Sequence, residues 1–372
     1  MRDIYYAIIG ISLSVLYIFY VILERLLIKY YRKKIPLIIH VNGIRGKSTT
    51  TRLIDAGLRN CGFKVLSKTT GTIPTIINSE NQDIVIKRLG KANIREQIKI
   101  LRKAAKENVD VLVIECMAVN PELQKICEEK ILNANITVIT NVRMDHIKDM
   151  GDTLEELAYA LSNTTPTNGI LVVNESEFIE LFNEQARKKN SSLIVAKPYD
   201  GIEDLDTFND NIAIALEVAR QLNLDESKFF DGLRKYHKDA GAYCEYKKEQ
   251  TIFLNGFSIN DPDSIKIAYE KVISKYNKDN LTILLNSRND RPTRIEQHLE
   301  MITSFKCKKI ILMGSATSYL NKKIKEKVNV EIQIYNNIDD LLKENIIFAI
   351  GNIGGDGMKI LEYFKKEGEK IC

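Results

Sequence analysis

Apolar and polar residues alternate along this chain with two different periods. Short runs rich in Val and Ile, typical of buried strands, occur at residues 36–41, 63–69, 109–116, 135–142, 169–174 and 192–197. Segments with the apolar spacing of amphipathic helices lie between them, at residues 47–60, 92–108 and 153–163. Strands that alternate with helices in this way predict βαβ units and a mostly parallel sheet.

A second series of the same kind follows residue 250. Its predicted strands, separated by helical segments, lie at residues 251–257, 281–286, 309–314, 330–335 and 345–351. The stretch KDAGAYCEYKKEQ, at 238–250, is polar and contains a turn-forming glycine, so we place a domain boundary within it. The predicted α/β architecture is a central domain over residues 31–245 and a smaller, Rossmann-like domain over residues 246–372.

The first residues follow neither pattern. Ile4 to Leu23 is a run of 20 residues without a charged side chain. As a helix it would be about 30 Å long, the thickness of a bilayer core. Basic residues follow this run, which argues against a cleaved secretory signal and places the remaining chain in the cytoplasm. We expect a single-pass membrane anchor over residues 1–30; the alternative is a buried core helix, although such helices seldom lack a polar face.

Length, charge and cysteine content narrow the class of protein. At 372 residues the chain exceeds what one core usually serves, which favours about two domains. The formal net charge is only +5, and much of it follows the apolar run, so we expect no nucleic-acid binding. The six cysteines include no CxxC pair. This scatter argues against a zinc site or a disulfide framework and is typical of a reducing compartment.

The sequence GIRGKSTT, at residues 43–50, carries the first clear chemistry. Gly46, Lys47 and Ser48 form the core of a nucleotide-binding P-loop between a predicted strand and a predicted helix. Backbone amides and the helix N-terminus would face the phosphates, Lys47 would reach the β- and γ-phosphates, and Ser48 would bind Mg²⁺. The loop is shorter than the common motif, because its first glycine is Gly43 instead of position 41.

Two further observations restrict the phosphate chemistry. A regulatory GTPase would carry N-K-x-D, which TNVRMDH at residues 140–146 does not supply. An ATPase needs an acid at the end of a buried strand, and Glu115 follows the apolar run VLVI at such a place. Glu115 is therefore a candidate metal ligand; the alternative is a solvated residue at a strand end.

Two segments, VNGIRGKSTT (41–50) and ITNVRMDHIKDMG (139–151), together resemble the Mur ligase superfamily, which includes peptidoglycan amino-acid ligases and folylpolyglutamate synthases. NGFSINDPDSI (255–265) is similar to that family's D-x-x-x-N-P-D-S segment, and IGNIGGDGM (350–358) resembles its late glycine-rich turn. The resemblance runs from about residue 36 to the C-terminus. It implies an ATP- and Mg²⁺-dependent ligase that activates a carboxylate as an acyl phosphate and then forms an amide.

The position of the loop selects a branch of that superfamily. It begins about ten residues after the last basic residues of the anchor, which leaves no room for the uridine-nucleotide domain of the peptidoglycan ligases. An anchor followed directly by the ATP-binding core resembles the ligase subunits of poly-γ-glutamate synthases. This resemblance implies glutamate and a growing poly-γ-glutamate chain as substrates at the cell membrane. One helix cannot conduct a polyanion, so we expect other membrane subunits of a synthase and export complex, and a homo-oligomer.

The resemblance also implies a role for each motif residue. Lys47, Asp145 and His146 would act in catalysis. Metal would be bound by Ser48, Thr70, Glu115 and His146, with His146 at a second Mg²⁺ near the acyl phosphate. The nucleotide would contact Gly43, Gly46, Lys47, Ser48, Thr49, Asn141, Asn211, Asn260, Asp261 and Arg288.

Several of these residues have a structural alternative. His146 could cap the following helix, and Asp145 could order its loop through backbone amides. Thr70 could be an ordinary strand residue, and Asn211 an ordinary residue at a helix N-terminus. The segment RNDRPTR, at 288–294, could be a solvated basic loop.

Two positions depart from the family pattern. Leu161 stands near the place where most Mur ligases have a carbamylated lysine that bridges metals, so the second metal has another ligand or is absent. Gly241-Ala242 replaces a Gly-Arg pair that contacts phosphate in the family.

Three functions are compatible with these motifs. The first is an ATP-dependent ligase that polymerises glutamate through its γ-carboxylate. The second is a folylpolyglutamate-type ligase, against which the anchor argues, since a soluble pterin gives no reason for a membrane location. The third is a membrane-tethered P-loop ATPase that forms no bond.

Overall fold

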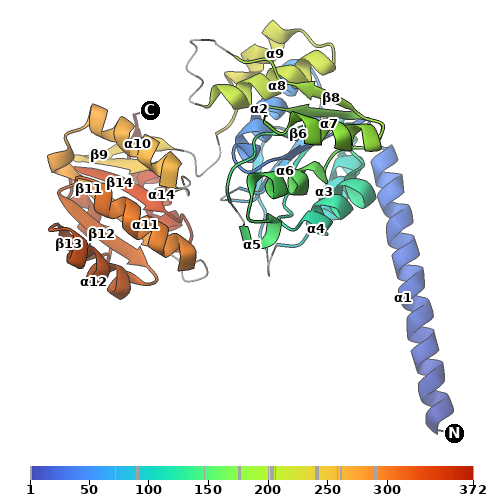
Figure 1. Cartoon of the computed structure of the whole chain (residues 1–372), viewed down its shortest axis with the longest axis horizontal. Helices are drawn as coiled ribbons and strands as arrows, with labels where there is room; N and C mark the ends of the chain where they lie inside the picture. Colours follow the sequence, from blue (N-terminus) through green and yellow to red (C-terminus); the bar gives the residue numbers. More distant parts are fainter. Residues whose placement is uncertain are drawn as a thin grey trace. The chain divides into compact units, whose positions relative to one another are not determined.

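The computed structural model (Figure 1) divides into two compact units, Met1–Asp239 and Ala240–Cys372. Each unit has a sheet and a hydrophobic core of its own. The structure describes residues 2–71, 73–88, 90, 92–145, 147–174, 177–199, 201, 205, 207–238, 243–257, 259, 262–287 and 292–371.

Helix α1 (Arg2–Lys33) contains the expected anchor and a short extension that packs on the first unit. No side chain from Asp3 to Leu27 is buried within this chain, which argues against a core helix, and the helix is long and apolar enough to cross a membrane by length and composition. Ile28 is buried, and Arg32 donates to the Asn133 carbonyl at 3.0 Å and to the Asn135 side chain at 2.9 Å. The helix therefore runs beyond the expected end of the anchor at residue 30.

The sheet of the first unit has the strand order β4-β3-β2-β5-β1-β6-β7-β8. Neighbours from β2 to β8 in this order pair in parallel, whereas β3 and β4 are antiparallel additions at one edge. The predicted mostly parallel sheet is thus confirmed. The strands are β1 (Leu37–Asn42), β2 (Val65–Thr69), β3 (Thr75–Ile77), β4 (Asp83–Val85), β5 (Val111–Glu115), β6 (Ile136–Ile139), β7 (Ile170–Val173) and β8 (Ser192–Val195).

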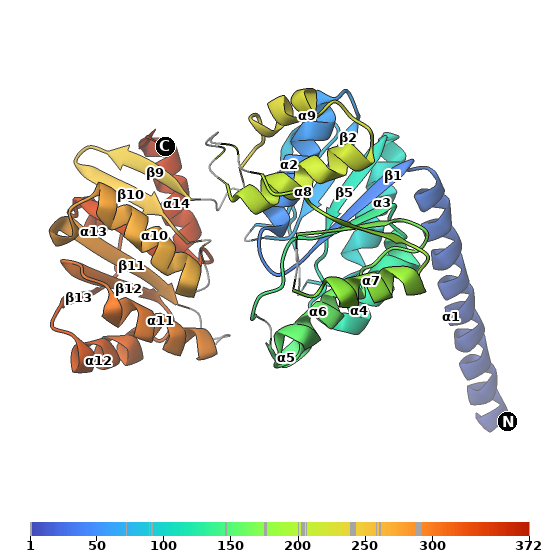
Figure 2. The same cartoon turned by 45° about the horizontal axis from the view of Figure 1, so that its top comes forward.

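Helices cover both faces of this sheet (Figure 2). One face packs on α2 (Lys47–Asn60), α8 (Asn209–Gln221) and α9 (Glu226–Leu233). The other face packs on α3 (Glu96–Glu107), α4 (Pro121–Ile126), the π-helix η1 (Cys127–Leu132), α5 (Ile147–Met150), α6 (Leu154–Ser162) and α7 (Ile179–Lys188). Successive residues of β1, such as Ile38 and Ile39, enter opposite cores. Burial on both faces explains why these strands are continuous apolar runs.

The second unit repeats the layered arrangement around the sheet β13-β12-β11-β14-β10-β9-β15. Its strands are β9 (Cys244–Lys248), β10 (Thr251–Asn255), β11 (Leu281–Ser287), β12 (Lys309–Gly314), β13 (Glu331–Ile334), β14 (Ile346–Gly351) and β15 (Glu369–Lys370). Its helices are α10 (Pro262–Lys275), the 3-10 helix η2 (Lys278–Asn280), α11 (Pro292–Ser304), α12 (Thr317–Lys327), α13 (Asp339–Leu342) and α14 (Asp356–Glu367). Strands β13 to β10 pair in parallel in that order, and β9 and β15 are antiparallel.

The stretch 238–250, in which we expected a domain boundary, contains the division between the two units after Asp239 and also the first strand of the second unit, β9. Residues 244–248 of that stretch pair with β10 along their whole length, although the sequence there is largely polar. Glu245 is buried, and its carboxylate accepts hydrogen bonds from Lys275 at 2.6 Å and Tyr276 at 2.7 Å. Because these partners are about thirty residues away, a local polarity pattern does not reveal the strand.

Candidate active site

The loop of residues 43–46 joins the carboxyl end of β1 to the N-terminus of α2, as the motif predicted. Both of its glycines are required by their surroundings. Gly46 has a φ of 79°, and a Cβ added there would lie 2.4 Å from Oδ1 of Asn211. Gly43 has a φ of 124°, and a Cβ there would lie 2.1 Å from Oγ1 of Thr140. Side chains from the ends of β6 and α8 therefore hold the loop where only glycine fits.

Lys47 lies over this loop in the first turn of α2. Its Nζ donates to the carbonyls of Gly43 at 2.7 Å and Ile44 at 3.2 Å. Burial lowers the pKa of Lys47, and the nearby Glu115 carboxylate opposes that change. The ammonium thus stands beside the anion-binding end of a helix, where it can transfer its hydrogen bonds to a phosphate.

Glu115 brings together three of the predicted metal ligands. Its carboxylate accepts hydrogen bonds from the Ser48 hydroxyl at 2.8 Å and from the amide and hydroxyl of Thr70 at 2.7 and 2.5 Å. The three residues come from β5, α2 and the end of β2, and Glu115 itself is buried. Because parallel strands end at the same edge, these distant residues converge beside Lys47.

This donor set fits a hard divalent cation bound together with a nucleotide. Mg²⁺ is usually held by one or two protein oxygens, several waters and the phosphates themselves. Ser48 and Glu115 supply one hydroxyl and one carboxylate within 2.8 Å of each other. Among the residues that the structure describes, no group of three His, Cys, Asp or Glu side chains could hold a metal ion alone.

Asn141 and Asp145 support the loop from the end of β6. The Asn141 side chain accepts from the Arg45 amide at 3.0 Å and donates to the Arg45 carbonyl at 3.1 Å. Asp145 forms an ion pair with the Arg45 guanidinium at 3.0 Å, and Thr140 donates to the same Arg45 carbonyl at 2.5 Å. The sequence interpretation missed Arg45 and Thr140, although both lie inside its quoted motifs.

Asn211 contacts the first turns of α2 from the N-terminus of α8. It is buried, accepts a hydrogen bond from the Thr50 hydroxyl at 3.2 Å and donates to Thr207 at 3.3 Å. Thr49 lies between these groups and the loop, half-buried in the first turn of α2. Asn211 therefore fixes the helix that carries Lys47 and Ser48.

Four predicted site residues lie outside the described residues, namely His146, Asn260, Asp261 and Arg288. The departure at Gly241-Ala242 lies outside them as well. Leu161 is described, and it is buried in the apolar core beneath β6 and β7. It therefore supplies no metal ligand at the position where the family resemblance implied a lysine in most members.

A buried lysine, Lys68, lies close to the cluster formed by Ser48, Thr70 and Glu115. It forms an ion pair with Glu96 at 2.9 Å and donates to the Gln97 side chain at 3.1 Å, and burial lowers its pKa. Gln97 in turn donates to the Glu115 backbone carbonyl at 3.0 Å. The sequence interpretation missed this pair of residues; the available signal was a lysine placed among the buried side chains of β2.

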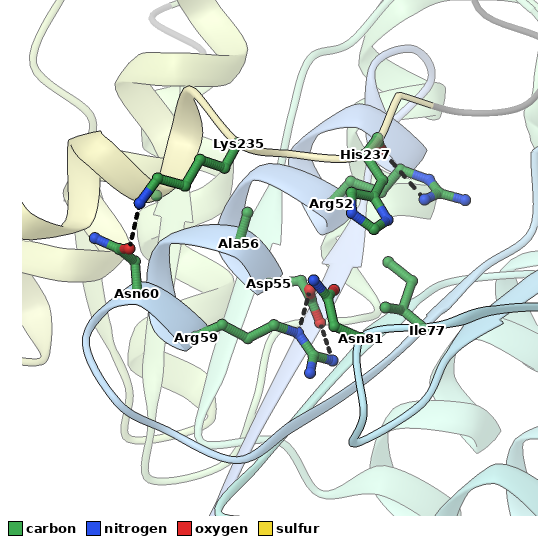
Figure 3. A pocket seen from close by; sticks show the side chains of 10 residues that line it. Arg52, Asp55, Ala56, Arg59, Asn60, Ile77, Asn81, Lys235 and His237 are labelled. Atoms are coloured by element: carbon green, nitrogen blue, oxygen red, sulfur yellow. Dashed lines mark hydrogen bonds and ion pairs between the residues drawn. The ribbon is translucent and has the colours of Figure 1, made fainter.

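A separate pocket of about 200 Å³ lies further along α2 (Figure 3). Figure 3 shows Asp55 joined to Arg59 by two hydrogen bonds, at 2.7 and 3.0 Å. Arg52 is paired with Asp83 and with the His237 carbonyl. Asp55, Arg59 and Arg52 each have an ion-pair partner within the protein, although the buried Nε of Arg52 has no hydrogen-bond partner among the described residues. We assign the pocket no part in phosphate chemistry. It is lined by Arg52, Asp55, Ala56, Arg59, Asn60, Ile77, Asn81, Gly232, Lys235 and His237.

Solved structures of similar fold include folylpolyglutamate synthases. The enzyme from Thermotoga maritima superposes with a TM-score of 0.66 over 92% of this chain and 93% of that chain, at 15% identity. The enzyme from Mycobacterium tuberculosis, complexed with ADP, gives a TM-score of 0.67 over 91% and 93%, at 12% identity. At such identities the likeness shows the fold alone.

Sequence comparisons are more specific. The model of the Mur ligase middle domain matches residues 41–219, and that of the poly-gamma-glutamate synthase CapB C-terminal domain matches residues 242–367. The capsule biosynthesis protein CapB of Bacillus anthracis is 35% identical over 97% of this chain and 83% of that protein. The PGA synthase CapB of Bacillus subtilis is 35% identical over 88% and 90%. The chain therefore belongs to the Mur ligase superfamily and, within it, to the CapB family of poly-gamma-glutamate synthases.

Proposed function

We propose that this chain is an ATP-dependent amide ligase that polymerises glutamate through its γ-carboxylate at the membrane. The observation that carries the proposal is the convergence of Lys47, Ser48 and Glu115 at one edge of the sheet. The match to the poly-gamma-glutamate synthase CapB C-terminal domain and the two CapB relatives support poly-γ-glutamate as the polymer.

The reaction has two steps. An oxygen of the glutamate γ-carboxylate attacks the γ-phosphorus of ATP, and the P–O bond to ADP breaks to leave an acyl phosphate. The amine of a second glutamate then attacks the acyl carbon after losing a proton, and the C–O bond to phosphate breaks. Each amide bond thus consumes one ATP and releases ADP and phosphate.

The chain's own residues act mainly through position and charge. Bringing a carboxylate to a triphosphate sets like charges close together, so the attack requires positive groups held in place beforehand. Lys47 would exchange its bonds to the carbonyls of Gly43 and Ile44 for bonds to the phosphates. The backbone amides of the loop would bind the phosphate oxygens, and Asn141 keeps the Arg45 peptide of that loop in position.

Ser48 and Glu115 would hold Mg²⁺ with the nucleotide, and Thr70 would orient the Glu115 carboxylate. The cation would offset the negative charge shared by the γ-phosphate and the incoming carboxylate. Lys68 and Gln97 would hold the Glu115 end of β5 in position through the carbonyl of Glu115. His146, Asn260, Asp261 and Arg288 remain predicted contacts of the acyl phosphate and nucleotide.

The exposed apolar part of α1 supports a single-pass location in the cell membrane, with the ligase units in the cytoplasm. A growing polyanion cannot cross a bilayer along one helix, so other membrane subunits would form its path. Self-association of the ligase units remains part of the same proposal.

Phosphate release by membranes that contain the full chain tests this function. With Mg²⁺-ATP, release should depend on D- or L-glutamate, and γ-linked polymer should appear with it. The variant Lys47→Ala should lose both, whereas Lys106→Ala, which removes an exposed lysine of α3, should keep both. Release that depends on Lys47 but ignores glutamate would instead favour a tethered ATPase, and addition of glutamate only to a folate acceptor would favour a folylpolyglutamate-type ligase.

A further inference from the structure

The contacts of α1 determine which edge of the central sheet lies nearest the bilayer. This inference rests on the proposed membrane anchor and concerns the first unit alone. Both views show α1 leaving this unit beside α3 (Figures 1 and 2), and the two helices are in contact. The direction in which α1 passes α3 is fixed by a contact near each end of the α1 extension.

The contact at the C-terminal end of α1 lies at the amino edge of the sheet, where the parallel strands begin. Arg32 donates to the Asn133 carbonyl and the Asn135 side chain, just before β6 starts. The Asn135 side chain also accepts from the Ile38 amide at the start of β1, at 2.8 Å. The end of α1 is thereby tied to the edge opposite the nucleotide loop.

The contact at the other end of the extension, around Glu24, lies at the carboxyl edge of the sheet, where the nucleotide loop is. Arg95, the residue before α3, forms an ion pair with Glu24 and lies over the Tyr20 ring, with Cζ 5.8 Å from its centre. The next two residues reach the active site, because Glu96 pairs with Lys68 and Gln97 donates to the Glu115 carbonyl. Glu24 is thus linked through three consecutive residues to the backbone of the predicted metal ligand.

The dimensions of the two elements agree with this arrangement. From Glu24 to Arg32 the helix rises about 12 Å, at 1.5 Å per residue. Strand β1 extends about 17 Å from Leu37 to Asn42, at 3.3 Å per residue. The extension of α1 and strand β1 run in opposite directions, with Arg32 near the start of β1. Glu24 therefore lies near the level at which β1 ends.

The uncharged run of α1 ends at Leu23, one residue before this contact. The bilayer surface therefore begins at the level of the carboxyl edge. Lys87 is exposed on the segment that leads into α3, and the sequence from 86 to 95 contains basic but no acidic residues. Two of these basic residues already have carboxylate partners, Arg88 in Glu96 and Arg95 in Glu24. Leu123 and Met144, which follow the ends of β5 and β6, are 40% and 48% exposed. Basic and apolar side chains together suit an anionic lipid surface.

We propose that the carboxyl edge of the central sheet, with its nucleotide loop, faces an anionic membrane surface and is held there by the contact of Arg95 with Glu24. Amide bonds would then form against the bilayer, and the polymer would have no distance to travel through the cytoplasm. The opposite amino edge, which carries Arg32 and Asn133, would face the cytoplasm.

Tryptophan fluorescence tests this orientation cleanly, because the chain contains no tryptophan. Ala92→Trp places a probe on an exposed residue before α3, and Lys106→Trp places a matched probe on an exposed residue in its last turn. Lys106 lies ten residues beyond Glu96, the first residue of α3, which places it about 15 Å further along the helix at 1.5 Å per residue. The full chain is reconstituted in phosphatidylglycerol-containing vesicles with a nitroxide on the lipid headgroup, and flotation selects chains that are inserted.

We expect several-fold stronger quenching at position 92 than at position 106. Equal quenching, stronger quenching at 106, or quenching at 92 only in native membranes would overturn docking on lipid; the last would point to a protein partner. Chains that do not float would refute the anchor itself and this orientation with it. Floating chains with the expected quenching but without glutamate-dependent phosphate release would refute only the proposed ligase chemistry.

Charge reversal tests the contact that holds the orientation. In the protein that carries Ala92→Trp, Glu24→Lys or Arg95→Glu should each remove most of the quenching, and the two substitutions together should restore it. Single variants that quench like the parent protein would overturn the role of this pair, as would a double variant that fails to recover. Quenching of the probe at position 106 should stay low throughout.

Discussion

The tight fit of Gly46 gives a prediction with a worked magnitude. Gly46→Ala would place a Cβ 2.4 Å from Asn211 Oδ1 at a φ of 79°, so Asn211 must move. The left-handed backbone alone should cost alanine about 1 kcal/mol. Moving Asn211 also breaks its hydrogen bonds with Thr50 and Thr207, at about 1 kcal/mol each. The total loss of unfolding free energy is about 3 kcal/mol.

Gly62, at the other end of α2, is a matched control. Its φ is 98°, but an added Cβ would have no atom within 4 Å, so Gly62→Ala should lose only about 1 kcal/mol. At about 3 °C per kcal/mol for a domain of this size, the unfolding midpoint should fall by about 9 °C for Gly46→Ala and about 3 °C for Gly62→Ala. Calorimetry of the full chain in detergent measures both shifts.

A double-mutant cycle then separates the clash from the backbone strain. Asn211→Ala alone removes the same two hydrogen bonds and should cost about 2 kcal/mol. The double variant should lose about 3 kcal/mol instead of the additive sum of about 5, a coupling of about 2 kcal/mol. Equal shifts for Gly46→Ala and Gly62→Ala, or an additive double variant, would refute the packing of Asn211 against the loop.

Three further predictions concern other parts of the first unit. Glu115→Gln keeps the shape but removes the charge, and the Mg²⁺ concentration for half-maximal phosphate release should rise at least about 100-fold; an unchanged value would exclude Glu115 as a ligand. Asn141→Ala frees the Arg45 peptide, so it should raise the KM for ATP, which steady-state kinetics measures. The unfolding midpoint measured by calorimetry should change little. Burial alone would lower the pKa of His40, but the neighbouring Cys116 and Glu128 side chains together outweigh it and raise the pKa from 6.5 to about 9. The stability from this pair should be complete below pH 6.5 and fall as the pH rises towards 9, whereas His40→Gln should show no such loss in melting curves.

Much of the fold could be predicted from the sequence, because strands buried on both faces leave apolar runs that any local window detects. Strands β3 and β4 were not predicted, since each has only three residues and those of β4 are all exposed. Strand β9 was not predicted either, because its buried Glu245 is neutralised by partners in α10 and just beyond it. Short edge strands depend on such tertiary contacts and not on their own composition.

The candidate site also has a part that the sequence predicted and a part that it did not. The loop, Glu115 and the family were predicted from contiguous motifs, and the family is confirmed by relatives that match most of the chain. The contacts that hold the nucleotide loop and α2 in place were not predicted, because they join residues far apart in sequence, such as Arg45 with Asp145 and Thr50 with Asn211. The path from Glu24 through Arg95 to Glu115 could be recognised only once α1 and α3 were placed side by side.

The most direct test of the ligase mechanism follows one oxygen atom. Glutamate labelled with oxygen-18 in its γ-carboxylate is supplied with Mg²⁺-ATP to membranes that contain the full chain. The acyl phosphate route carries one labelled oxygen from the carboxylate into each phosphate released, because that C–O bond breaks when the amide forms. Labelled phosphate in proportion to γ-linked polymer is the predicted result. Unlabelled phosphate, with labelled oxygen entering only from labelled water, would show hydrolysis of ATP without activation of glutamate and would contradict it.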